Sequence, residues 1–520
     1  MHRQLESRAR VIVVAICLVV VGIAGQLAPA SAAPESYLGI LPELREDIRS
    51  KTAGKVSSYD IDVRFDPATS TVSGRLRLRL VNHYGQPLTD VAFRLYPNAY
   101  YYGEGEIRVS GTRIEGQPVE PTFEADETAM RLPLPSPLQP SKATTVEMRF
   151  ATVVPTDSSG TFGIFSRDSR RGTWVLADWY PIVAGWEAET GWRLAPPTDL
   201  GDPTFSYVAL YDVAIRAPAE LVVVATGSEV ETREEGQTIL RRFVSGPARE
   251  FALVLDDDYV SAVTDVGGIR ISVYANAGTI GAENAELALN AAKRALAAYS
   301  DRYGPYPYEE LDLVETELGG ALGVSWAGLI FLDSDDLLAQ PIASEQDVQR
   351  LTFTVTHEVG HQWWGSVVGA NSNDYPYLVE GLTNYLTTVS LNDTVGPDVG
   401  YGQLRLQIVL PYLEALDRYG DGVVSLPITE PQEHPPRSVL IYAKAALGFL
   451  AIRAEIGDEA FFAGLRDYAD SFAFGIATPD DLRRAFERAG GVSLEDTWRF
   501  WFESAETTPT DVQELLDVAA

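Results

Sequence analysis

Two histidines and a glutamate form the segment with the clearest chemical meaning, His357-Glu358-Val359-Gly360-His361. Residues four apart lie above one another on a helix, so both imidazoles can reach the same metal ion. The chain contains only five histidines, which makes a chance occurrence of this spacing rare. The alternative is a buried helix face that happens to carry two histidines. We interpret the segment as two metal ligands with an acid beside them.

A third metal ligand is expected farther along the chain, because catalytic zinc commonly takes three protein ligands and leaves one position for water. Glu380 follows His361 after eighteen residues, enough for a turn between two helices. Apolar residues around it recur at helical spacing, namely Leu378, Leu382, Tyr385 and Val389. Glu380 and Asn384 lie on the other face. We expect the Asn384 amide oxygen to accept the N–H of a metal-bound imidazole; an ordinary solvated asparagine is the alternative.

The elements that must position these residues change character along the chain. Alternating apolar and polar residues, separated by turn residues, predict β structure from Lys55 to about Tyr274. The clearest predicted strands are 59–65, 75–81, 146–150, 211–215, 221–225, 239–243 and 269–274. A tryptophan-rich loop interrupts them between about Trp174 and Pro203. It either lines a substrate cleft or packs against a neighbouring domain.

After Asn276 the apolar residues follow a helical period. A first helix is predicted around 289–299 and ends at Gly304-Pro305. Short strands are predicted at 311–315 and 326–332, and helical patterns dominate from the N-cap residue Ser344 to about Glu503.

These patterns predict an α+β multidomain chain. We expect an antiparallel β saddle or sandwich over residues 33–275, a mainly helical domain over 276–506 and a polar tail over 507–520. Residues 1–32 read as a signal peptide, with arginines, an apolar run and a small-residue cleavage pattern ending at Ala32. An uncleaved membrane anchor is the alternative. The predicted location is extracytoplasmic, either secreted or periplasmic.

Composition excludes several classes of partner. The chain has 41 Lys and Arg against 73 Asp and Glu, a formal net charge of −32. This charge argues against a nucleic-acid partner, because phosphate binding needs a basic face. Membrane association is expected only if the N-terminal segment stays attached. The one cysteine, Cys17, lies in that segment, so disulfides and thiolate catalysis are not expected in the mature chain. The oligomeric state is not predicted.

At this point the motifs resemble a known family. His-Glu-x-x-His, eighteen residues and then Glu-Gly is similar to the pattern of the gluzincin metallopeptidases, specifically the membrane alanyl aminopeptidase family. The segments that carry the resemblance are 93–99, 303–307, 357–365, 379–381 and 441–446. The resemblance implies a β saddle domain followed by a thermolysin-like catalytic domain, in a short form without the helical-repeat C-terminal domain of the large members.

The resemblance also implies roles for individual residues. His357, His361 and Glu380 would hold one zinc ion per chain, and Glu358 would act as the general base. Tyr442 matches the catalytic tyrosine of the family, although an alanine, Ala445, replaces a glycine of that motif. Peptides are the implied substrates.

One segment departs from the family pattern. The family carries a glutamate on an edge strand before the metal-binding helix, and this acid binds the free α-amine of the substrate. Here the matching residues are Gly323, Val324 and Ser325, with the serine in the place of the acid. The strand predicted over 326–332 can still bind an extended peptide by edge pairing, because backbone hydrogen bonds do not require that acid.

Three functions therefore compete. The first is an aminopeptidase-like zinc hydrolase with altered amine recognition. The second keeps the zinc chemistry but cleaves peptides internally or acts on a nonpeptide substrate. The third is a noncatalytic peptide-binding or scaffold protein that retains the fold.

Overall fold

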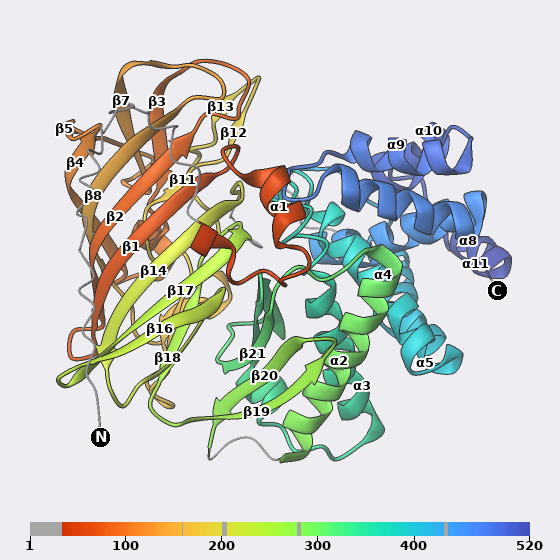
Figure 1. Ribbon diagram of the computed structural model, residues 1–520. Helices are drawn as coiled ribbons and strands as arrows, with labels where there is room; N and C mark the ends of the chain where they lie inside the picture. Colours follow the sequence, from red (N-terminus) through yellow and green to blue (C-terminus); the bar gives the residue numbers. More distant parts are fainter. Residues whose placement is uncertain (1–33, 159, 200–204, 278–281, 431–434, 520) are drawn as a thin grey trace, which may run out of the picture.

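The computed structural model describes residues 34–158, 160–199, 205–277, 282–430 and 435–519. The predicted signal peptide, 1–32, lies outside these residues. In the part that the structure describes, no helix combines the length and the apolar character needed to cross a membrane. Figure 1 shows a β-rich half, formed by the first part of the chain, beside a half that carries most of the helices.

An eight-stranded sheet dominates the first half. Its strands follow the order β16-β17-β14-β1-β2-β8-β4-β5. Their bounds are β1 Ser57–Asp66, β2 Thr71–Val81, β4 Glu106–Ile114, β5 Gln117–Pro118, β8 Ala143–Val153, β14 Ala209–Pro218, β16 Ser228–Glu235 and β17 Thr238–Ala248. Neighbours pair antiparallel except β1 and β14, which run parallel. Every second side chain of β1 is buried, which is the alternation that predicted these strands.

Smaller sheets cover this large sheet. One contains β9 Phe165–Arg167, β10 Trp174–Leu176, β15 Val222–Ala225 and β18 Leu253–Asp256, and another contains β3 Leu88–Arg94, β6 Thr122–Glu124, β7 Ala129–Leu138 and β11 Ile182–Val183. The hairpin of β12 Trp186–Glu187 and β13 Gly191–Trp192 completes the set. The tryptophan-rich segment therefore contains short strands. Trp179 packs within the β-rich half, where it is fully buried and donates to the carbonyl of Phe251 at 3.0 Å.

A second, five-stranded sheet begins the other half. Its order is β19-β20-β21-β23-β22, so β22 is an edge strand. The bounds are β19 Tyr259–Val266, β20 Ile269–Asn276, β21 Glu310–Thr316, β22 Gly323–Trp326 and β23 Leu329–Asp333. Because β19 and β20 pair into this sheet, a division by sheet membership falls before Tyr259 rather than near residue 275. A strand's own alternation does not reveal which sheet it joins.

The strand expected over 326–332 is confirmed for 329–332, which lie in β23, but its first residues form the turn of a hairpin with β22. The chain turns at Ala327-Gly328 between β22 and β23, and Gly328 has a φ of +75° that favours glycine. Apolar residues on both sides of the turn hid it in the sequence. The edge strand available to a peptide is consequently β22 and not the 326–332 segment.

Helices cover this sheet and extend the second half. The helices before α5 are α1 Arg45–Thr52, α2 Ala282–Tyr303, α3 Glu345–Gly360 and α4 Glu380–Thr394. The later ones are α5 Pro397–Gln403, α6 Leu410–Tyr419, α7 Arg437–Val439, α8 Ala445–Ser471, α9 Pro479–Gly490, α10 Glu495–Trp498 and α11 Pro509–Ala519. Helix α3 packs against α2 and α4, and α4 also contacts α8. The predicted end of α2 at Gly304-Pro305 is confirmed.

The end of the chain differs from the predicted polar tail. Residues 509–519 form α11, which packs on α8 and buries Val512, Leu515 and Leu516. These three apolar residues recur at helical spacing, but they are few, and the acidic residues Asp511, Glu514 and Asp517 stand among them.

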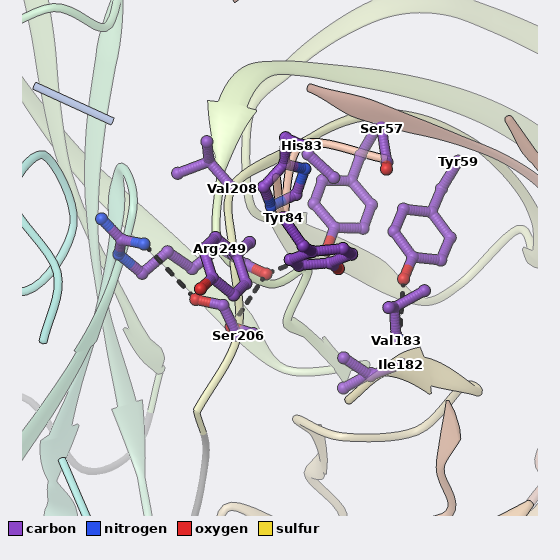
Figure 2. Close-up of a pocket in the computed structure, with 12 residues that line it drawn as sticks. Ser57, Tyr59, His83, Tyr84, Ile182, Val183, Ser206, Val208 and Arg249 are labelled. Carbon is purple, nitrogen blue, oxygen red and sulfur yellow. Dashed lines mark hydrogen bonds between the residues drawn. The ribbon is translucent and has the colours of Figure 1, made fainter. Parts of the chain in front are cut away.

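Arg249, directly after β17, forms one of the contacts between the two halves. Its guanidinium donates to the carbonyls of Gly365 at 2.6 Å and Gly475 at 2.7 Å, both in the helical half. Figure 2 shows Arg249 beside a small cavity of about 20 Å³, whose lining includes Tyr59 and His83. This volume holds about one water molecule. None of the predicted site residues lines it.

Asp312, in the middle strand β21, predicts a pH effect on stability. Its side chain is 4% exposed, and burial, together with the nearby Glu310 carboxylate, raises its pKa to about 7 despite the Ser272 hydroxyl and Arg270. The folded state therefore binds this proton more tightly than the unfolded state. The contribution of this proton to the free energy of unfolding is fully present below about pH 4 and is lost as the pH rises to about 7.

We expect Asp312→Asn to raise the free energy of unfolding at pH 8 by up to about 4 kcal/mol relative to wild type and to leave it nearly unchanged at pH 4. Urea unfolding at the two pH values measures this difference. The exposed Asp417→Asn is the matched control and should show no such dependence. Equal effects of Asp312→Asn at both pH values would contradict the prediction.

Candidate metal centre

Helix α3 carries the two histidines and the acid between them. It begins with a capping box, in which the Ser344 hydroxyl accepts from the Asp347 N–H and the Asp347 carboxylate accepts from the Ser344 N–H. Its last two turns are buried, including His357 and Glu358. His361 is the C-cap residue and keeps near-helical backbone angles. The helix therefore ends at the site, with both imidazoles on one face.

Helix α4 brings the third residue to the same point. Glu380 is its first residue, and its Oε2 atom lies 3.4 Å from His357 Nε2 and 3.3 Å from His361 Nε2. The two Nε2 atoms are 3.0 Å apart. Ligands at about 2.1 Å from a tetrahedral zinc ion are about 3.4 Å from one another. The three ligand atoms thus fit one zinc ion per chain, held by two imidazoles and a carboxylate.

The tautomer of His361 is set by the backbone. Its Nδ1 atom lies 3.0 Å from the carbonyl oxygen of Trp364. Since a carbonyl only accepts, Nδ1 carries the proton and Nε2 presents its lone pair to the metal position. Thr383 Oγ1, on α4, lies 3.4 Å from the same nitrogen.

The electrostatics of the three residues favour a cation. Burial alone lowers the pKa of His361, but the Glu380 carboxylate outweighs it and raises that pKa to about 9. Burial raises the pKa of Glu380, yet the two imidazoles hold it well below its usual value. A site that stabilises a proton between these groups also stabilises a metal cation, which competes with that proton.

Glu358 points toward the edge strand β22. Ser325 Oγ donates to Glu358 Oε2 at 2.7 Å and lies 3.0 Å from the backbone carbonyl of the same residue. A Cβ atom on Gly323 would come within 2.6 Å of the Glu358 carboxylate. The strand therefore lies directly against the acid, and a side chain at position 323 would displace the Glu358 carboxylate from this position. Gly323, Val324 and Ser325 are all partly exposed.

Tyr442 lies near the His357 imidazole. It lies in η8, a π-helical turn over Leu440–Lys444, and its ring centroid is 6.3 Å from that of His357. Its side chain is 38% exposed, whereas both chain neighbours are buried. The structure thus brings together all the predicted ligand and catalytic residues around one point.

Asn384 does not take the predicted place. Its amide is not bonded to an imidazole; Nδ2 donates instead to the backbone carbonyl of Tyr442 at 2.9 Å. The carbonyl of Trp364 serves the His361 ring in its stead. Helical spacing correctly placed Asn384 on the face of Glu380, but η8 packs on that face, and the sequence does not show this.

Sequence reasoning also missed an anchor beneath Tyr442. Lys444 is fully buried, and its ammonium donates to Asp421 Oδ2 at 2.9 Å and to the carbonyls of Gly422 at 2.8 Å and Ser504 at 2.7 Å. In the sequence, the only indication that Lys444 supports the site is its position two residues after Tyr442. His434, which the sequence places in a proline-rich loop and predicts to be a surface residue rather than a metal ligand, lies outside the described residues.

Comparison with known proteins agrees with this geometry. Residues 287–501 match the model of the peptidase family M1 domain. Aminopeptidase N of Lactobacillus helveticus is 28% identical over 290 residues, which are 54% of this chain and 34% of that protein. Aminopeptidase 2 of Candida albicans is 25% identical over 314 residues, 59% of this chain and 33% of that protein. The match to these curated relatives spans about a third of their length.

A solved structure resembles the chain over most of its length. The M1 zinc metallopeptidase of Deinococcus radiodurans has a TM-score of 0.63 at 21% identity, and the match covers 88% of this chain and 95% of that one. This likeness shows a shared two-domain fold, with a mostly β first part and a helical second part. Residues 287–501, which match the peptidase family M1 domain, also contain His357, His361 and Glu380, so this part of the chain is similar to the catalytic domain of that family.

Proposed function

We propose that the chain is an exported zinc-dependent metallopeptidase that hydrolyses peptide bonds. The observation that carries the proposal is the Glu358 carboxylate, which is buried beside three converging zinc ligands and is not one of them. The curated relatives are named aminopeptidases, and an M1 neighbour at 20% identity was solved with a Tyr-Ser-Ala substrate. These names support peptides as the substrate class.

The residues of the site divide the reaction among them. Zinc in a His₂Glu site supplies a Lewis acid, which polarises a carbonyl oxygen and lowers the pKa of water towards 7. Glu358 takes the proton of the attacking water and later delivers it to the leaving amine. Tyr442 donates a hydrogen bond to the carbonyl oxygen as negative charge builds on it. The edge of β22 holds the extended peptide through its backbone.

Recognition of the substrate's amino terminus is proposed to be weak. Ser325 is neutral, and its hydroxyl already donates to Glu358. A charge-assisted hydrogen bond between an ammonium and a carboxylate is worth about 1.5–3 kcal/mol. Without such an acid at this position, the chain gains no comparable free energy from a free α-amine there. N-terminally blocked peptides are therefore substrates too.

The test compares free and N-acetylated forms of the same peptide. We expect kcat/KM values within about tenfold of each other, because the missing ion pair is worth at least that factor. Activity should disappear with a chelator and return with zinc, and metal content should be one zinc per chain on the same preparation. A strict requirement for a free amine would show that another group recognises it. Zinc-loaded protein that cleaves neither form would overturn the proposed peptidase.

Export rests on the N-terminal pattern of arginines, apolar residues and Ala30-Ser31-Ala32. N-terminal sequencing of the mature protein should begin at Ala33. A mature protein that still begins at residue 1 or 2 would favour the membrane-anchored alternative.

A further inference from the structure

We propose that Asn384 is a positioning residue for Tyr442. Its side-chain amide holds the backbone of Tyr442 in place and so fixes the tyrosine hydroxyl relative to the zinc ligands. The inference rests on the proposed function, in which Tyr442 stabilises the charge on the substrate carbonyl. Asn384 is not one of the three zinc ligands.

The first support is the position of Asn384 on the ligand helix. Asn384 lies one turn after Glu380 on α4 and is 4% exposed. Its Nδ2 atom donates to the Tyr442 carbonyl at 2.9 Å. An α-helix rises 1.5 Å per residue, so the two residues are about 6 Å apart along a rigid element. One helix thus supplies both a zinc ligand and the contact that locates Tyr442.

The second support is the direct packing of α4 on η8. A Cβ atom at Gly381 would lie 2.6 Å from the Ile441 carbonyl oxygen and 2.6 Å from Ala445 Cβ. Glycine at 381 therefore lets the two backbones approach, which brings the Asn384 amide within hydrogen-bonding distance. Ala445 stands where the resemblance leads us to expect glycine, and the missing side chain at Gly381 accommodates it.

The third support is the contrast between the backbone and the side chain of Tyr442. Lys444 anchors the end of η8 through three acceptors. Tyr442 is 38% exposed, so the backbone that carries its ring helps to set the position of the hydroxyl. The Asn384 contact acts on residue 442 itself. Displacing a reacting group by about 1 Å costs about 10²-fold in rate.

The test uses two variants that remove the donor, Asn384→Asp, which keeps the shape, and Asn384→Ala, which adds no charge. Both should keep one zinc per chain and a nearly unchanged KM, while kcat falls about 10–100-fold. Asn392→Asp is the matched control, because Asn392 lies on the same helix with an exposed side chain. It should retain the wild-type kcat.

A double-variant cycle separates positioning from a general structural role. In a Tyr442→Phe background, Asn384→Ala should cause less than about a twofold further loss, because the hydroxyl through which it acts is already gone. A full further loss, a loss of zinc, or an unchanged kcat in both single variants would overturn the inference.

A structural readout keeps this inference separate from the proposed function. If the zinc-loaded wild type cleaves no peptide, the proposed function fails. The inference is then decided by crystal structures of wild type and Asn384→Ala. Displacement of the Tyr442 hydroxyl by about 1 Å or more supports it, and an unmoved hydroxyl overturns it.

Discussion

Replacement of Glu358 by glutamine is expected to lower kcat by at least about 10²–10⁴-fold while zinc content stays at one per chain. An amide cannot take the proton of the attacking water, so the general base is lost. Zinc is retained because the ligand atoms belong to His357, His361 and Glu380. The Gln amide oxygen still accepts the hydrogen bond from Ser325, so the local geometry is kept.

Single-turnover kinetics and metal analysis on the same preparation measure both parts of this prediction. Glu345→Gln is a matched control, since Glu345 is an exposed residue in the first turn of the same helix. It should retain wild-type activity. Undiminished turnover in Glu358→Gln would remove the general-base assignment, and loss of zinc would show that Glu358 contributes to binding the metal.

Tyr442→Phe is expected to lower kcat by about 10²–10³-fold, equivalent to about 2.7–4 kcal/mol in the barrier. The variant removes only the hydroxyl that donates to the charge developing on the substrate oxygen. Because this contact strengthens in the transition state, kcat and kcat/KM should fall together and KM should change little.

Steady-state kinetics on one peptide distinguish this role from simple substrate binding. Tyr401→Phe is the control, as Tyr401 is 51% exposed on α5. We expect no change in that variant. A raised KM with an unchanged kcat for Tyr442→Phe would instead place Tyr442 in ground-state binding.

Local patterns predicted much of the fold, because they depend on neighbouring residues. Alternation along β1 and the Ser344 cap of α3 were both readable from the sequence, and the structure confirms these two elements. Sheet membership was not readable, since pairing joins segments far apart in the chain. The division at residue 275 accordingly separates β19 and β20 from the sheet that they join, and the predicted strand 326–332 ran across the turn at Gly328 into β23.

The candidate site shows the same division. The sequence by itself determined which residue types stand at metal-ligand spacing. The spacing of four residues between the two histidines, which places them on one face of a helix, is a local property of the chain. Only the tertiary structure decided that Ser325 bonds to Glu358 and that Asn384 bonds to Tyr442. Both contacts join segments more than thirty residues apart. Their geometry follows from how β22 packs on α3 and η8 packs on α4, which no local pattern encodes.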